Sequence, residues 1–231
     1  MFGGIFFLML VFMAISWFVG SKLKKKFKEF SDIPTSSGLS GAEVAQKMLS
    51  DHGIFDVEII TTEGQLSDHY NPQNKTINLS YDVYHGRNVA AAAVAAHETG
   101  HAVQHATAYS FLQFRSAMVP IVSLSSKMMN FIFIASMLFM GMSLLRIDTV
   151  LLIVVLAQAA ITLFSVVTLP VEVDASNRAL IWLNNTGITQ GQEYDKAKSA
   201  LSWAAMTYVV SALAAIASLL YYLSMFLGND E

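Results

Sequence analysis

The stretch His97-Glu98-Thr99-Gly100-His101 places two imidazoles and a carboxylate at a spacing that suits a metal ion and a hydrolytic water. Residues i and i+4 of an α-helix lie on one face, so His97 and His101 can bind one zinc ion while Glu98 points at the water beside it. This HExxH pattern predicts one Zn²⁺ ion, with Glu98 as general base. The alternative is a half-buried histidine pair that is satisfied within an ordinary helix.

A catalytic zinc usually takes three protein ligands and keeps one position for water, so the histidine pair needs a partner. Glu172, just after Pro170, is the candidate. Asp174 would point in another direction on a helix. It could hydrogen-bond to a metal-binding side chain and orient it, or form a salt bridge with Arg178 at i+4. The alternative for Glu172 is a carboxylate that complements a helix N-terminus.

The helix that must carry both histidines is predicted over residues 88–106, where a run of alanines leads into His97 and no proline interrupts. Three histidines and a glutamate fall within nine residues of this helix. Such a segment is a poor membrane span, so we expect it at or near the membrane surface.

The composition is that of a membrane protein: 54% of the 231 residues are hydrophobic, 13% are charged, and the mean hydropathy is +0.49. A net charge of -3 without a clustered basic face gives no reason to expect nucleic acid as a partner. Because the chain has no cysteine, disulfides and thiolate ligands are excluded, and any metal must be held by histidine and carboxylate.

Four stretches are apolar and long enough to cross a bilayer. The first is followed at once by five lysines, which predicts a retained signal anchor. The second and third form a hairpin, which returns Glu172 to the side of the membrane that holds His97. We therefore predict five parts: an anchor over 1–21, a folded part over 22–116, a transmembrane hairpin over 117–169, a helical segment over 170–203 and a C-terminal span over 204–227.

Lysine and arginine are concentrated in two of these parts, with nine between Lys22 and Arg115 and three between Arg178 and Lys198, out of 14 in the chain. The positive-inside rule then places both parts in the cytoplasm and both termini outside. We expect a multi-pass protein of the cell membrane with its catalytic site on the cytoplasmic side. Its fourth span would end close to the C-terminal residues 228–231.

Inside the folded part, capping-box spacing at Ser40–Glu43 predicts a helix over 42–50, and residues 57–61 and 76–80 read as strands. The second strand lies just upstream of the HExxH helix. If it is a sheet edge, Thr76, Ile77, Asn78 and Leu79 can pair with an extended peptide and lay it across the metal. The alternative is a strand covered on both sides.

Several segments together resemble the YugP-type bacterial membrane zinc metallopeptidases and, more distantly, the membrane gluzincins of the HtpX and CAAX prenyl protease group. The resemblance runs over most of residues 60 to 185. The segments that carry it are Asp68-His69-Tyr70-Asn71-Pro72, Leu79-Ser80, Val94 to Gln104 and Leu169 to Leu180. It implies a mainly α membrane protein with four transmembrane helices and a small cytoplasmic α+β, gluzincin-like domain that carries the HExxH helix.

Carried over to this chain, the resemblance implies His97, His101 and Glu172 as zinc ligands and Glu98 as catalytic base. The wider group often has an acidic residue four positions after its ligand glutamate, where this chain has Ser176. Asp174 and Ser176 are therefore both candidates to orient the ligating histidines. His105 continues the i+4 stripe, but a fourth ligand would close the water position, so we expect it nearby and unbound.

The predicted reaction is hydrolysis of peptide bonds in peptides or proteins, membrane proteins among them. Four side chains are candidates to stabilise the oxyanion: Tyr194, Arg178, His69 and Tyr70. Two other functions stay open: an intramembrane site-2-type protease, and a catalytically silent membrane adaptor or chaperone that zinc braces. The sequence indicates neither the natural substrate nor the oligomeric state.

Overall fold

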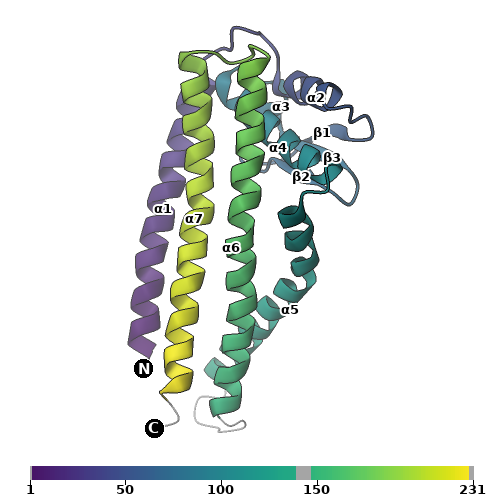
Figure 1. Cartoon of the computed structure of the whole chain (residues 1–231). Helices are drawn as coiled ribbons and strands as arrows, with labels where there is room; N and C mark the ends of the chain where they lie inside the picture. The colour runs from purple at the N-terminus through teal and green to yellow at the C-terminus, as the bar shows by residue number, and fades with distance from the viewer. Residues whose placement is uncertain (1, 139–146, 229–231) are drawn as a thin grey trace. The chain divides into compact units, whose positions relative to one another are not determined.

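A computed structural model describes residues 2–138 and 147–228 of the chain. Seven helices and three strands follow one another in these residues (Figure 1). Their bounds are α1 (Phe2–Ser31), α2 (Gly41–Asp51), β1 (Glu58–Thr62), β2 (His69–Asn71), β3 (Thr76–Ser80), α3 (Tyr81–His85), α4 (Val89–Ala106), α5 (Ser110–Leu138), α6 (Ile147–Asn185) and α7 (Gln192–Leu227). The C-terminal residues 229–231, and Arg146 in the connection within the predicted hairpin, lie outside the described residues.

The chain divides into two compact units. One comprises residues 1–17, 114–169 and 208–231, and the other comprises residues 18–113 and 170–207. Among the described residues, four helices are long and apolar enough to cross a membrane: α1, α5, α6 and α7. The four predicted spans are thus present as helices, and α4 is not among them. Every residue of the candidate site belongs to the second unit.

The sheet of the second unit has the order β1-β3-β2, with β1 parallel and β2 antiparallel to β3. Of the two possibilities for Thr76, Ile77, Asn78 and Leu79, the covered strand is the one observed and the substrate-binding edge is not, because β3 is the central strand and all five of its residues are buried. Its backbone groups are used by its two neighbours, so it has no edge to offer a peptide. Strand β2, which has three residues, was not predicted from the sequence.

Helix α4 forms as predicted and begins at an N-cap, where the Asn88 side chain accepts a hydrogen bond from the backbone N–H of Ala91. Its alanines are almost wholly buried and let neighbouring elements approach closely. Helix α2 packs against α4, and its N-terminus is closed by a capping box of Ser40 and Glu43. Together with β3 and the end of α6, these helices build the hydrophobic core that fixes the histidines in place.

Helix α6 runs without interruption through Pro170 and carries Glu172 well inside it. We expected a new helical segment to begin after this proline, and the structure corrects that expectation. A proline removes one backbone hydrogen bond from a helix, but the bonds on either side can carry the helix past it. Glu172 is therefore not a helix N-terminal carboxylate, and the alternative explanation for its position falls away.

Candidate metal centre

His97 and His101 of α4 lie close to Glu172 of α6, although more than 70 positions separate them from it in the sequence. The Glu172 Oε2 atom lies 3.4 Å from His97 Nε2 and 3.5 Å from His101 Nε2. One ligand atom from each residue lies within 4.8 Å of the other two, so this group could hold a metal ion. Glu172 is only 2% exposed, and His101 is buried as well.

The donor set and its spacing fit zinc. In a tetrahedral site with ligands about 2.0 to 2.1 Å from the ion, the ligand atoms are about 3.4 Å apart. The two distances from Glu172 Oε2, 3.4 and 3.5 Å, have this value. Two imidazoles and one carboxylate also form the set that leaves a fourth position for water.

Close contact between α4 and α6 brings Glu172 within reach of the two histidines. Gly100 lies between the two histidines, and a Cβ atom added there would stand 2.6 Å from the carbonyl oxygen of Ala175. Any side chain at this position would force the helices apart. The glycine of the HExxH segment therefore sets the helix separation on which the position of Glu172 depends.

The Nδ1 atoms of His97 and His101 have different hydrogen-bond partners. His97 Nδ1 is hydrogen-bonded to the Ser176 hydroxyl at 3.1 Å. His101 Nδ1 lies 3.0 Å from the side-chain carbonyl oxygen of Gln104, which can only accept, so the His101 Nδ1–H donates. That tautomer leaves a lone pair on His101 Nε2, the atom that faces Glu172.

Gln104 links His101 to a second carboxylate. Its amide nitrogen donates to the Val171 carbonyl and to Asp174 Oδ2, both at 2.8 Å. Arg178 Nε donates to the same Asp174 oxygen at 2.6 Å. Asp174 thus acts on His101 through Gln104, while Ser176 contacts His97 directly. Sequence reasoning missed Gln104, although its place three residues after His101, on the same helix face, was a usable signal.

Glu98 is held by the edge strand of the sheet. Its Oε2 atom accepts a hydrogen bond of 3.0 Å from the backbone N–H of Tyr70 in β2. The Tyr70 hydroxyl lies 2.7 Å from His105 Nδ1. Tyr70 thus links His105 to Glu98, and His105 is not part of the group that could hold a metal ion.

The electrostatics of His101 reflect its neighbours. Burial by itself would lower the pKa of His101, but the adjacent Glu172 carboxylate, with the charge of Glu98, outweighs it and raises the pKa above its ordinary value. The two carboxylates therefore favour positive charge at His101. A metal cation satisfies the same carboxylates without a proton on the ring.

The four oxyanion candidates lie in different surroundings. Arg178 is tied to Asp174 and stacks over the Tyr109 ring. Tyr194 packs against the hydrophobic core, and the ring of His69 is bonded to the Ser67 carbonyl. Tyr70, through its backbone bond to Glu98, is the candidate whose contact with the site is direct.

Comparison with known proteins agrees with this geometry. A family described as "Putative neutral zinc metallopeptidase" matches residues 5–227. A "Putative membrane protease YugP" of Bacillus subtilis (strain 168) is 36% identical over 226 residues, covering 97% of this chain and 98% of that protein. The chain belongs to the YugP-type zinc metallopeptidase family. The resemblance found in the sequence is thereby confirmed, and the match extends beyond the two metal-site segments to all four apolar helices. No solved structure matches this YugP-type chain.

Proposed function

We propose that this protein is a membrane-bound zinc metalloendopeptidase that hydrolyses peptide bonds at the cytoplasmic face of the membrane. His97, His101 and Glu172 would hold one zinc ion, and Glu98 would act as general base. The observation that carries the proposal is the convergence of the two Nε2 atoms on one Glu172 oxygen at 3.4 and 3.5 Å. The surrounding domain would then be gluzincin-like, with its third ligand on a helix after HExxH.

Bound zinc would polarise the scissile carbonyl and lower the pKa of a water molecule. Glu98 then takes the proton from the attacking water and delivers it to the leaving amine. The Tyr70 N–H holds the Glu98 carboxylate in one orientation. Ser176, Gln104 and Asp174 keep the imidazole rings fixed, so their roles are to position the ligands.

The strand that would align the substrate is β2, and not β3. Strand β2 is an edge of the sheet and pairs only with β3 among the described residues. The N–H of Tyr70, in the middle of β2, points away from β3 and towards Glu98. Because Glu98 takes the outward Tyr70 N–H, an extended peptide on this side of β2 would pair with the Tyr70 carbonyl, which points the same way, and would pass in front of Glu98. This geometry supports β2 as the strand that aligns the substrate.

Glu172 belongs at the membrane surface if α6 crosses the bilayer from its first turn. At a rise of 1.5 Å per residue, Glu172 lies about 38 Å along the helix from Ile147, beyond a hydrocarbon core of about 30 Å. The basic residues of 22–116 and 170–203 support a cytoplasmic position for this end of the helix. Membrane proteins with cytoplasmic segments are then natural substrates.

The alternative functions are less well supported. An intramembrane protease carries its HExxH motif within a span, whereas α4 is not one of the four candidate spans among the described residues. A zinc-braced adaptor needs no base, yet Glu98 is 8% exposed and held beside the ligands by a backbone donor. A purely structural site gives no reason for that arrangement.

The decisive experiment compares the wild type with Glu98→Gln in detergent, by zinc analysis and by cleavage of an unstructured protein. Glutamine keeps the shape of the side chain and cannot accept the proton, so we expect about one zinc per chain in both proteins. Cleavage should fall by at least about 100-fold in the variant.

Two results would count against the proposal. Zinc in both proteins with cleavage in neither would favour the adaptor. Equal cleavage by both proteins would assign the base to another residue or the activity to a contaminant, and the addition of a chelator would separate these two cases.

A further inference from the structure

The sheet has a second edge, β1, on the far side of β3 from the catalytic strand β2. Among the described residues β1 pairs with β3 only. The Glu58 N–H donates to the Lys75 carbonyl, so in this parallel ladder Glu58, Ile60 and Thr62 face β3. The backbone groups of Ile59 and Thr61 therefore point outward, where another strand could pair with them.

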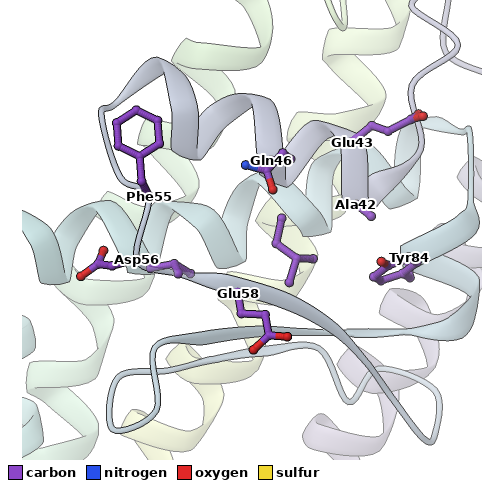
Figure 2. Close-up of a pocket in the computed structure, with 9 residues that line it drawn as sticks. Ala42, Glu43, Gln46, Phe55, Asp56, Glu58 and Tyr84 are labelled. Carbon is purple, nitrogen blue, oxygen red and sulfur yellow. The ribbon is translucent and has the colours of Figure 1, made fainter.

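Two cavities lie along this edge. One, of about 670 Å³, is bounded by α2, the segment from Phe55 to Ile59, and Tyr84 (Figure 2). The other, of about 450 Å³, follows directly and is lined by residues 61–64 together with Tyr81 and Asp82. Every residue of β1 except Ile60 thus lines one of the two cavities.

The larger cavity is lined by apolar and polar side chains together. Val57, Ile59 and Tyr84 are partly buried and pack against the hydrophobic core. Glu43, Gln46 and Glu58 also line it, and Figure 2 shows the carboxylates of Glu43 and Glu58 at its margins. Such a space suits a side chain with a long apolar stem and a polar end, as in lysine and arginine.

The charge along the edge has one sign. Five carboxylates line the two cavities, and no lysine, arginine or histidine is among their described lining residues. Two of the five are paired with basic side chains of the same chain, Asp56 with Lys75 and Glu43 with Arg87. In the described part of the chain, Glu58, Glu63 and Asp82 make no ion pair. Two carboxylates along the edge are thus neutralised by Lys75 and Arg87. The other three could pair with basic side chains of a ligand.

We propose that the outer edge of β1 is a binding site for an extended, lysine- or arginine-bearing peptide segment. The segment adds a fourth strand through the backbone groups of Ile59 and Thr61. Its basic side chains lie in the two cavities, with their charges near Glu58, Glu63 and Asp82. An anionic lipid surface or a nucleic acid is repelled by the same carboxylates, so a basic peptide is the occupant that the charge selects.

This site does not depend on the catalytic proposal, because none of its residues belongs to the metal centre. If both hold, β1 captures the basic segments that membrane proteins carry beside their spans on the cytoplasmic side. The enzyme would then bind such a substrate at one sheet edge and cut it at the other.

The test uses the full chain in detergent at low salt and a fluorescent peptide of alternating lysine and valine, about eight residues long like a typical strand. Binding is followed by anisotropy. We expect this peptide to bind and its counterpart with glutamate for lysine not to bind. Binding should persist with a chelator and in Glu98→Gln, which separates this site from the catalytic one.

Charge reversal of the edge gives the sharper test. The double variant Glu58→Lys/Glu63→Lys should raise the dissociation constant about tenfold, since each reversal replaces an attraction by a repulsion. The matched control is Asp32→Lys, an exposed carboxylate of the same unit away from β1, which should leave binding unchanged. Ile59→Pro removes an outward N–H and no ladder bond, and should weaken binding about fivefold.

Three outcomes would overturn the proposal. The first is equal binding of the lysine and glutamate peptides, and the second is a double variant that behaves like Asp32→Lys. The third is loss of binding on addition of the chelator, which would assign the peptide to the metal centre. Sedimentation of the protein without peptide tests whether β1 binds a second copy of the chain. A dimer that Ile59→Pro dissociates would show that it does, and would overturn the proposal of a basic peptide.

Discussion

Carboxylates lie on both sides of the small sheet, and burial gives them opposite surroundings. On the side of β2, Glu98 and Asp174 accept hydrogen bonds from other elements, and Glu172 is buried with one carboxylate oxygen facing two imidazoles. On the side of β1, Glu58 and Glu63 are exposed and make no ion pair among the described residues. A buried charge must be compensated within the protein, whereas an exposed one is compensated by water.

The comparison teaches which group suits which task. A carboxylate fixed by donors has one orientation, as catalysis and metal binding require. A carboxylate in solvent keeps its charge available for a ligand that arrives from outside. Substitutions on the two sides should therefore differ in kind: those beside the metal centre should affect zinc and every substrate, and those along β1 should affect basic ligands alone.

The largest effect is expected from Gly100→Ala. Alanine is the better residue in a helix by about 1 kcal/mol, but its Cβ would stand 2.6 Å from the Ala175 carbonyl and push α6 away from α4. Overpacking of this kind costs about 1 to 3 kcal/mol and would also withdraw Glu172 from the histidines. Zinc content and the thermal midpoint should both fall.

The matched control is Gly20→Ala, where an added Cβ meets nothing within 4 Å. It should keep zinc content and cleavage at wild-type levels. If Gly100→Ala behaves in the same way, the helix contact is not what brings Glu172 close to the histidines.

A smaller effect should follow from Gln104→Ala. The loss of this amide leaves His101 Nδ1 and Asp174 without their shared partner. Zinc affinity, measured by competition with a chelator, should drop about 10- to 100-fold, the usual range for a residue that orients a ligand. Ser176→Ala removes one hydroxyl contact to His97 and should cost less. The reverse order would show that Ser176, and not the Gln104–Asp174 link, is the main support.

The smallest effect is expected from Glu58→Gln. This side chain is exposed and without an ion pair in the described structure, so the free energy of unfolding should change by no more than about 0.5 kcal/mol. Zinc content and cleavage of a neutral peptide should stay at wild-type values. A clear loss of stability would mean that Glu58 supports the fold, and the contrast between the two sides of the sheet would no longer hold.

Local pattern was enough to predict the helix of His97 and His101 and the four long apolar helices. Both depend on spacing within a short stretch: i and i+4 place two imidazoles on one face, and about 20 apolar residues suffice for a span. Glu172 could also be chosen from the sequence, because two crossings of the membrane return the chain to the same side. Its role as a ligand remains a proposal.

Tertiary structure decided what depends on partners distant in sequence. Strand order cannot be inferred from one strand, so the sequence left open whether β3 is an edge or a covered strand, and β2 and β1 cover it. The support of His101 by Gln104 and Asp174 joins residues 70 positions apart. Residue types and spacing thus determined which groups can do chemistry, while the packing of α4 against α6 and β2 decided which of them meet, because side-chain contacts form only when the backbones are close.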